Sequence, residues 1–257
     1  MSTTAPRCVL ITGATGGLGS ALAREYAAPG VTLILQGRNA EVLWALAEAC
    51  RAMGARVVSH TVDATTRVPY HQWMRQVARR EAPELLIICA GVNNSIGPAG
   101  ESERWVDVER LLEINVVAAM ASVDAVLPGM RYRGGGQIAL LSSLAAYHGL
   151  PLTPAYSASK AALKAYGEAL RGGLAPLGIW VNVVMPGYVD SAMCRAMPGP
   201  KPFVWSAARA ARVIRRGLAA NRARITFPWL LAFGCWWLAV LPAAVSGRIL
   251  RLLRYGP

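Results

Sequence analysis

A tyrosine and a lysine in the middle of the chain are spaced for proton transfer. Tyr156 and Lys160 lie four residues apart in YSASKAALKAYGEAL, a strongly helical segment, so both side chains project from one helix face. An ammonium beside a phenol favours the phenolate, which predicts a lowered tyrosine pKa, suited to proton exchange with a carbinol oxygen. Ser143 ends the upstream apolar run QIALLSS, and its hydroxyl is able to bind the same oxygen. The three residues indicate acid–base chemistry on a carbonyl or an alcohol.

A glycine-rich segment near the start of the chain has the pattern of a phosphate-binding turn. TGATGGLG follows the apolar run 9–11 and precedes a helix expected to begin near residue 18. Glycines permit a tight turn and a close backbone approach to a pyrophosphate, whose charge is met by the amides of a helix N-terminus. This context favours dinucleotide binding over a purely structural turn. The expected contacts are Gly13, Thr15, Gly16, Gly17, Leu18 and Gly19.

The end of the next apolar run indicates which dinucleotide is bound. An NAD-specific protein usually has an acidic residue here to hold the ribose hydroxyls, whereas this chain reads Gln36-Gly37-Arg38. A guanidinium forms charge-assisted hydrogen bonds with a phosphate. Arg38 therefore favours NADP(H), with NAD(H) still possible; the alternative is a solvated surface arginine.

The segments that must position these residues alternate between short apolar runs and helical stretches. The runs CVLITG, VTLILQG, RVVSHTVD, ELLIICAG, QIALLSS and IWVNVVMPG are typical of strands, and several are apolar throughout, as in strands buried on both faces. Helical stretches separate them, one of them near residues 40–53. The alternation predicts βαβ units. We therefore expect the α/β class: a Rossmann-like, doubly wound parallel sheet flanked by helices, within residues 1–202.

In combination, these motifs resemble the short-chain dehydrogenase/reductase family in its short form, over about residues 7–225. Alone, the YxxxK spacing is common and a serine often ends a strand. The order and spacing of the whole set are those of the family. The matching stretches are TGATGGLG at 12–19, Asp63 after the third strand, CAGV at 89–92, Asn115 in LLEINVV, Ser143, YSASK at 156–160 and PGYVDS at 186–191.

The resemblance implies a role for each matching position. Tyr156 would be the general acid/base and Ser143 would orient the carbonyl, while Lys160 would tune the tyrosine and bind the ribose. Asn115 would complete a proton relay. The implied cofactor contacts are Asp63 at the adenine with Ala64 beside it, Ala90 and Gly91 in the cleft, and Pro186, Gly187, Val189 and Ser191 towards the nicotinamide. The implied reaction is hydride transfer between nicotinamide and a substrate carbon, with no metal.

Three positions depart from the family pattern. Ile88 and Cys89 replace the asparagines of its NNAG stretch, which affects a stabilising strand contact. Ser191 replaces a threonine and keeps the hydroxyl. The glycine spacing through Gly16 is that of the longer sugar-nucleotide epimerases, so the glycine motif alone does not decide the branch.

The basic residues gather at the C-terminal end. Residues 1–190 carry 16 Lys+Arg and 14 acids, whereas residues 191–257 carry 11 Lys+Arg and no acid. Residues 225–247 hold no charge and reach the roughly 20 residues that span a bilayer. Arginines at helical spacing precede and follow this block, which is typical of basic amphipathic helices at an anionic lipid surface. They are Arg209, Arg212, Arg215 and Arg216 before the block and Arg248, Arg251 and Arg254 after it.

We therefore expect residues 203–257 to form a helical, apolar and basic extension that packs on the same domain, on a membrane surface, or both. Trp229, Trp236 and Trp237 favour the membrane interface. A hydrophobic lid or a dimer interface is the alternative. A true span is less favoured, because Pro228 and Pro242 interrupt the block and both flanks are basic.

Composition excludes several classes of protein. With 257 residues, 54% hydrophobic and 16% charged, the chain is not disordered. Nucleic acid is not expected as a partner, because the basic stretch brackets an apolar block instead of interleaving with exposed aromatics. Scattered cysteines argue against a disulfide framework or a metal site and favour a reducing compartment. They are Cys8, Cys50, Cys89, Cys194 and Cys235. Without an apolar leader, we expect a cytoplasmic protein, peripheral or monotopic on the cytoplasmic face of a membrane.

The expected function is that of an NADP(H)-dependent oxidoreductase, a ketoreductase, acting on a carbonyl or secondary alcohol. The segments AAYHGLP and YVDSAMCRAMPGP should line the substrate pocket and are mostly apolar, which favours a lipid-like, steroid or long-chain ketone. A homo-oligomer is expected. One alternative is a soluble oligomeric dehydrogenase of a small polar alcohol or sugar, with the tail as a subunit interface. The other is a non-catalytic dinucleotide sensor or scaffold, which the intact Ser143, Tyr156 and Lys160 argue against.

Overall fold

A seven-stranded parallel sheet forms the centre of the protein. The computed structural model describes residues 5–97, 100–253 and 255. The strand order is β3-β2-β1-β4-β5-β6-β7, with every neighbouring pair parallel. The strands are β1 (Cys8–Thr12), β2 (Thr32–Gly37), β3 (Arg56–Thr61), β4 (Leu85–Ile88), β5 (Gly136–Leu141), β6 (Ile179–Pro186) and β7 (Arg224–Phe227). The predicted α/β class with a doubly wound parallel sheet is confirmed.

The strand order reverses between β1 and β4. The chain adds β2 and β3 on one side of β1, then crosses back to place β4 on the other side. Thr12 at the end of β1 lies beside Ile88 at the end of β4. Open α/β sheets bind ligands in the crevice outside the carboxyl ends of their strands at such a point. The fold therefore places the glycine-rich segment after β1, and residues 89–91 after β4, at the expected binding position.

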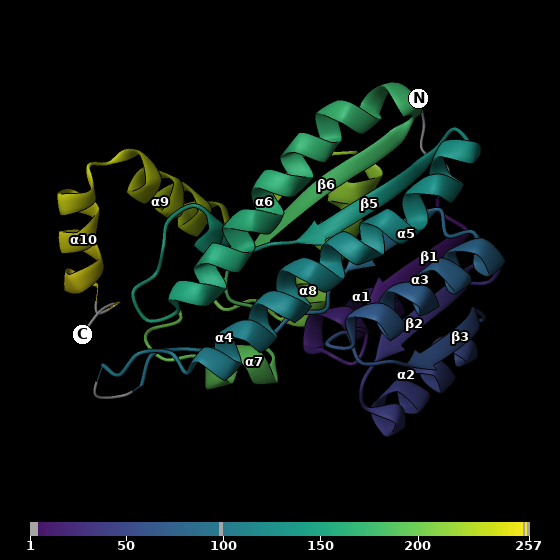
Figure 1. Cartoon of the computed structure of the whole chain (residues 1–257), viewed down its shortest axis with the longest axis horizontal. Coiled ribbons are helices and arrows are strands. Elements are labelled where there is room, and N and C mark those ends of the chain that lie inside the picture. The colour runs from purple at the N-terminus through teal and green to yellow at the C-terminus, as the bar shows by residue number, and fades with distance from the viewer. Residues whose placement is uncertain (1–4, 98–99, 254, 256–257) are drawn as a thin grey trace.

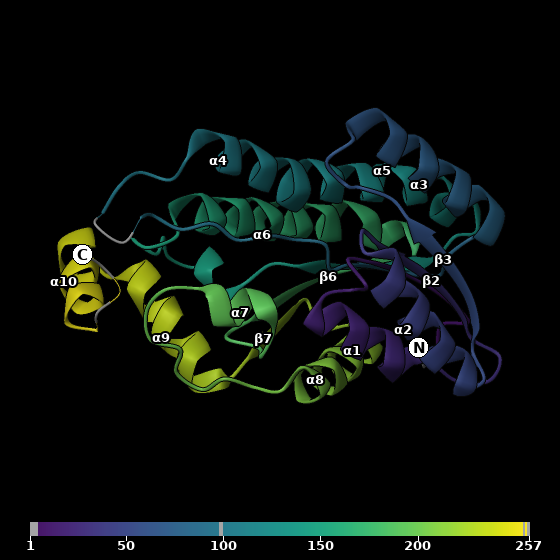
Figure 2. The same ribbon diagram turned by 90° about the horizontal axis from the view of Figure 1, so that it is seen from below.

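Helices cover both faces of the sheet (Figure 1; Figure 2). The first layer consists of α1 (Gly17–Tyr26), α2 (Ala40–Ala52) and α8 (Ala207–Ala219), and the second of α3 (Arg67–Glu81), α5 (Ala118–Tyr132) and α6 (Pro154–Leu174). Each layer buries its own apolar cluster against the sheet. Two covered faces explain why the strands read as continuous apolar runs. The short elements are α7 (Ala192–Ala196) and two 3-10 turns, Leu144–Ala146 and Ala175–Leu177.

One helix of the described residues is long and apolar enough to cross a membrane by length and composition. α4 (Trp105–Leu112), a π-helical turn (Glu113–Val117) and α5 form this continuous helix from Trp105 to Tyr132. Its most apolar stretch is 56% buried inside the protein. Because α5 packs on α3 and the sheet, packing in the core accounts for this composition.

The predicted helical extension, residues 203–257, begins within the sheet architecture. α8 buries Ala210, Ala211 and Ile214 in the core beside α1 and exposes its arginines. The expectation that this first basic helix offers an apolar face to lipid is therefore wrong, because the core occupies that face. Residues 224–227 then form β7, the edge strand beside β6. The sequence does not predict β7, because its residues run directly into the apolar block.

The apolar block itself is divided into two helices. α9 (Trp229–Val240) and α10 (Ala243–Leu252) follow β7, and Pro228 and Pro242 cap their N-termini. Because α9 has only 12 residues, against the roughly 20 that span a bilayer, residues 225–247 do not form a single spanning helix. Figure 1 shows α9 and α10 at the left, beyond the ends of β5 and β6 and away from α1, α2 and α3.

Candidate active site

A cavity of about 690 Å³ lies over the carboxyl ends of the central strands. Its walls come from the glycine-rich segment, the ends of β2, β4 and β5, helix α6, the segment after β6, and helices α9 and α10. It brings together most residues that the sequence indicates for a site. They are Gly13, Thr15, Gly16, Gly17, Leu18, Gly19, Arg38, Ala64, Ala90, Gly91, Ser143, Tyr156, Lys160, Pro186, Gly187, Val189 and Ser191.

The glycine-rich segment forms a turn that only glycine permits at two positions. Gly13 has φ +64, and a Cβ added there would lie 2.6 Å from the backbone nitrogen of Ala90. A Cβ on Gly19 would lie 2.3 Å from the Gly13 carbonyl oxygen. Gly16 is the N-cap of α1, and the first turn of α1 holds no acidic residue. The turn therefore offers free helix amides and a positive dipole end to an anion, which fits a pyrophosphate.

Replacing Gly13 with alanine is expected to lower the free energy of unfolding by about 2–4 kcal/mol, because it adds both a strained φ and a clash with Ala90. Urea unfolding monitored by circular dichroism measures the loss. Gly30→Ala is the matched control, since Gly30 has φ +81 but nothing within 4 Å of an added Cβ. Its expected cost is about 1 kcal/mol. Equal losses in the two variants would show that the close approach to Ala90 has no energetic weight.

Gln36 holds this turn in place through hydrogen bonds. The backbone N–H groups of Gly13 and Ala14 donate to the Gln36 side-chain oxygen and carbonyl oxygen at 2.9 and 2.8 Å. The Gln36 side-chain amide donates to the carbonyl oxygen of Val62 at 2.6 Å. The side chain is 2% exposed. NAD-specific proteins usually have an acidic residue near this position. Here Gln36 instead joins the glycine-rich turn to the ends of β2 and β3.

Arg38 and Asp63 follow the ends of β2 and β3. Arg38 is exposed and lines the cavity, beside Gly37, where an added Cβ would lie 2.5 Å from Thr15. Asp63 does not line the cavity; its carboxylate accepts a hydrogen bond from the backbone N–H of Thr65 at 2.9 Å. This bond is the main cause that lowers the pKa of Asp63, and Arg38 contributes less. A carboxylate fixed in its own turn leaves Arg38 as the charged group on this wall.

Lys160 is anchored beneath Tyr156 by the end of β5. Its ammonium donates to the carbonyl oxygen of Leu141 at 2.9 Å and lies 5.5 Å from the centre of the Tyr156 ring. The Ser142 hydroxyl donates to the Lys160 carbonyl oxygen at 2.7 Å. Helix α6 approaches the sheet this closely because residue 167 is glycine, where a Cβ would lie 2.6 Å from Val183. The lysine therefore has a fixed position at the cavity floor.

Burial sets the protonation of this pair. It raises the pKa of Tyr156 to about 12, against an opposing hydrogen bond with Ser143. It lowers the pKa of Lys160 to about 8. The expectation of a lowered tyrosine pKa is therefore wrong for this structure, because the loss of hydration on burial outweighs the hydrogen bond with Ser143. At neutral pH the phenol holds its proton, which suits proton donation.

Asn115 lies behind the cavity and outside its lining. Its side chain accepts from the Val92 N–H at 2.8 Å and donates to the Val92 carbonyl oxygen at 3.0 Å. It also donates to the Ser159 hydroxyl, which donates to the Tyr156 carbonyl oxygen. A Cβ on Gly91 would lie 3.3 Å from the Asn115 side-chain oxygen and 3.4 Å from the Lys160 nitrogen. Asn115 thus joins the loop after β4 to the first turn of α6.

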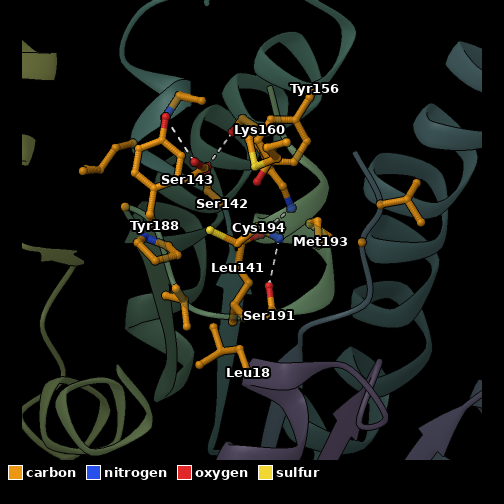
Figure 3. A pocket seen from close by; sticks show the side chains of 18 of the residues that line it. Leu18, Leu141, Ser142, Ser143, Tyr156, Lys160, Tyr188, Ser191, Met193 and Cys194 are labelled. Atoms are coloured by element: carbon orange, nitrogen blue, oxygen red, sulfur yellow. Dashed lines mark hydrogen bonds between the residues drawn. The ribbon is translucent and has the colours of Figure 1, made fainter. Parts of the chain in front are cut away.

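The other end of the cavity is apolar and is lined by the C-terminal helices. Figure 3 shows Ser143, Tyr156 and Tyr188 around this end, with Leu18 and Ser191 on the side of the glycine-rich turn. The Tyr188 and Tyr255 hydroxyls are 2.8 Å apart, and Tyr255 donates to the Pro200 carbonyl oxygen at 2.6 Å. The C-terminal segment from α9 onward contributes ten residues to the lining. They are Leu231, Gly234, Cys235, Trp237, Leu238, Leu241, Ile249, Leu250, Leu253 and Tyr255.

A family model described as short chain dehydrogenase matches residues 7–200. The chain belongs to the short-chain dehydrogenase family. It is an oxidoreductase, as the sequence predicts. Among the residues that the structure describes, no group of His, Cys, Asp or Glu is placed to hold a metal ion.

Relatives of this short-chain dehydrogenase cover either the whole chain or most of it. An uncharacterised oxidoreductase of Myxococcus xanthus is 34% identical over 96% of this chain and 98% of its own. Dehydrogenase/reductase SDR family member 7B of Danio rerio is 35% identical over 73% of this chain and 62% of its own. A short-chain dehydrogenase from Sphingobium yanoikuyae, solved in complex with NADPH, has a TM-score of 0.80 and 26% identity, over 96% of this chain and 95% of that chain.

The substrate end of this dehydrogenase includes a wall that the sequence does not predict. The segment after β6 lines the cavity as expected, whereas the share of α9 and α10 in its wall was not specified. Gly187 explains how α9 comes so close, because a Cβ there would lie 2.9 Å from Leu231. The uncharged block at 225–247 is a sequence signal for this wall. A helix that is apolar on all sides needs apolar surroundings on more than one side.

Proposed function

We propose that this oxidoreductase is an NADP(H)-dependent ketoreductase acting on apolar ketones of lipid, steroid or long-chain type. The observation that carries the proposal is the continuity of the cavity. It runs from the glycine-rich turn, past Tyr156 and Lys160, to an apolar wall built by α9 and α10. A small polar alcohol or sugar would find few polar partners on that wall, which weakens the alternative of a polar-substrate dehydrogenase.

The residues present fit a nicotinamide dinucleotide. The turn at 13–19 and the N-terminus of α1 would hold the pyrophosphate, Arg38 the 2′-phosphate, and Lys160 the ribose. Asp63 and Ala64 would lie at the adenine, Ala90 and Gly91 along the cleft, and the 186–191 segment at the nicotinamide. The NADPH complex of the Sphingobium relative supports this choice. When bound, the cofactor supplies or accepts the hydride.

The protein's own part in the reaction is to hold the carbonyl oxygen and to provide a proton. The Tyr156 phenol, protonated at neutral pH, would donate its proton to the carbonyl oxygen during reduction. The Ser143 hydroxyl would bind the same oxygen and fix its position. Lys160 would stabilise the resulting phenolate with its positive charge. Asn115, through Ser159, would keep the first turn of α6 in register and complete the route by which the proton is replaced.

Arg38→Ala is expected to weaken NADPH binding about 10- to 100-fold and NADH binding by less than about threefold, because only NADPH carries the 2′-phosphate. Isothermal titration calorimetry with both dinucleotides measures the two affinities. Arg131→Ala is the control, since Arg131 is exposed in α5 and does not line the cavity. If Arg38→Ala weakened the binding of NADPH and NADH equally, the proposed role of Arg38 in binding the 2′-phosphate would be contradicted.

The substrate class is tested by NADPH oxidation against a series of methyl ketones of increasing chain length and a sterol ketone. kcat/KM is expected to rise with apolar surface, since each buried methylene contributes about 0.8 kcal/mol, or roughly fourfold. Activity confined to short polar carbonyls would contradict the proposed apolar substrate class and favour the dehydrogenase of a small polar alcohol or sugar. Tight NADPH binding without turnover of any ketone would instead favour the sensor or scaffold alternative.

We further propose that the chain divides functionally at residue 202. Residues 1–202 would bind the cofactor and carry out the reaction. Within residues 203–257, α8 and β7 would complete the sheet and its core, and α9 and α10 would complete the substrate end and associate with a membrane surface. The five unpaired cysteines support a reducing compartment, and hence the cytoplasmic face of that membrane. A homo-oligomer is proposed as well.

A further inference from the structure

Helix α9 has two apolar faces. One face lines the cavity with Leu231, Cys235 and Leu238. The opposite face exposes large apolar side chains, with Trp229 72% and Phe233 55% accessible. Its members are Trp229, Leu230, Phe233, Trp236 and Val240, which we call the outer face of α9. A helix that is apolar on all sides is normally buried on all sides, and a large exposed apolar patch marks an interaction site. We therefore expect a binding partner to cover the outer face.

The outer face is built around an aromatic cluster. The rings of Phe233 and Trp236 are stacked with centres 6.3 Å apart, and Trp237 meets each of them edge-on at 6.1 and 5.3 Å. Tryptophan side chains, which carry one polar N–H on a large apolar ring, favour the interface between a bilayer and water. The cluster is therefore chemically suited to a lipid surface.

The charged residues of the C-terminal segment that carries α9 and α10 are all basic. Arg248 and Arg251 are exposed on α10, the next helix. No acidic residue occurs anywhere between residues 191 and 257. Each basic residue near an anionic membrane contributes about 1 kcal/mol of attraction. The two C-terminal helices therefore combine an apolar aromatic face with exposed basic side chains.

We propose that the outer face of α9 and the arginines of α10 dock the enzyme on an anionic bilayer surface. The proposal rests on the proposed function and deepens it by naming the docking surface and the route of the substrate. A second copy of the chain fits less well, because a two-fold contact brings identical surfaces together and would set these arginines against each other. The short length of α9 makes the attachment interfacial, without a span.

Docking in this way places the mouth of the cavity at the lipid. Trp237 lines the cavity and is also 45% exposed, next to the outer face. Leu253, which follows α10, likewise lines the cavity and is 55% exposed. We take Trp237 and Leu253 as the rim of the cavity on the side of the C-terminal helices. An apolar ketone dissolved in the bilayer would enter past Trp237 and Leu253 and reach Tyr156 along the apolar wall of α9 and α10.

Vesicle sedimentation tests the docking surface with the full chain, without cofactor or substrate. One set of vesicles contains phosphatidylcholine with phosphatidylglycerol and the other phosphatidylcholine alone. The wild type is expected to sediment with the anionic vesicles. Phe233→Ser/Trp236→Ser should lower that partitioning by about 10- to 100-fold, since two apolar side chains leave the interface. Trp44→Ser, at a 65% exposed tryptophan on α2 far from α9 in Figure 1, should bind like the wild type.

The charge contribution is tested by Arg248→Gln/Arg251→Gln. We expect about 10- to 30-fold weaker binding to anionic vesicles at low salt and no change with phosphatidylcholine alone. A wild type that stays in the supernatant with anionic vesicles would overturn the proposal. So would a concentration-dependent dimer that Phe233→Ser/Trp236→Ser abolishes, because the occupant would then be a second copy.

Turnover of a short, water-soluble ketone without vesicles separates this proposal from the proposed function. Phe233 and Trp236 do not line the cavity, so their double variant should keep wild-type kcat. A long-chain ketone presented in anionic vesicles should be reduced about tenfold more slowly by this variant. Reductase activity without vesicle binding would overturn only the docking, whereas vesicle binding without any NADPH-dependent turnover would support the docking and overturn the ketoreductase.

Discussion

Tyr156→Phe is expected to lower kcat by about 10³- to 10⁴-fold while changing the Kd of NADPH by less than about threefold. The phenol lines the cavity beside Ser143 and holds its proton at neutral pH, because burial raises its pKa to about 12. General acid catalysis by one positioned group contributes about 10² to 10⁴. Phenylalanine keeps the ring and the helix but has no proton to donate, so binding survives and turnover is lost.

Single-turnover NADPH oxidation with the longest ketone that wild type reduces measures this loss, and calorimetry measures NADPH affinity. Tyr188→Phe is the matched control. Tyr188 lines the same cavity, but its hydroxyl is hydrogen-bonded to Tyr255, so we expect less than about a tenfold fall in kcat. Turnover that survives Tyr156→Phe, or falls as far in Tyr188→Phe, would assign proton donation to a different group.

The parts of the site that sequence could predict depend on local patterns. The turn at 13–19 is encoded by its own glycines, and the Tyr156–Lys160 pair by helical spacing alone. The parallel sheet followed from six apolar runs at regular intervals. These signals are short in range, so a chain read without a structure already contains them.

The parts that sequence could not predict depend on contacts between distant segments. The sequence does not show that Gln36 would be used to join three segments, because its partners lie in the glycine-rich turn and after β3. The raised pKa of Tyr156 follows from burial, which is a tertiary property. β7 has only four residues and merges with the apolar block. The wall made by α9 depends on the close contact at Gly187.

Lys160→Met is expected to lower kcat by about 10²- to 10³-fold, since the phenolate loses its neighbouring charge. In the wild type, kcat/KM for NADPH should fall as pH rises through about 8, the pKa to which burial lowers this lysine. The charged form exists below that pH and is lost above it. A pH profile of kcat/KM measures the step, and the methionine variant should lack it.

The same pKa predicts a change of opposite sign in stability. Between pH 8 and the ordinary lysine value of 10.5, the unfolded chain holds a proton on Lys160 that the native protein has released. The free energy of unfolding therefore rises with pH across this window, as activity falls. At pH 7 the buried charge is a cost, so Lys160→Met should raise the free energy of unfolding by about 1–2 kcal/mol, even after loss of the hydrogen bond to Leu141.

Lys164→Met separates this effect from a general gain on removing a lysine. Lys164 lies one turn further along α6, with its ammonium 3.1 Å from Glu168, so its removal should give no gain in stability and at most a twofold change in kcat. Urea unfolding of both variants at pH 7 and pH 10 makes the comparison. If Lys160→Met is less stable than the wild type at pH 7, the hydrogen bond to Leu141 outweighs the desolvation of the ammonium. If the stabilities of the wild type and Lys160→Met change equally between pH 7 and pH 10, Lys160 does not titrate in this window, and the activity step near pH 8 must come from another group.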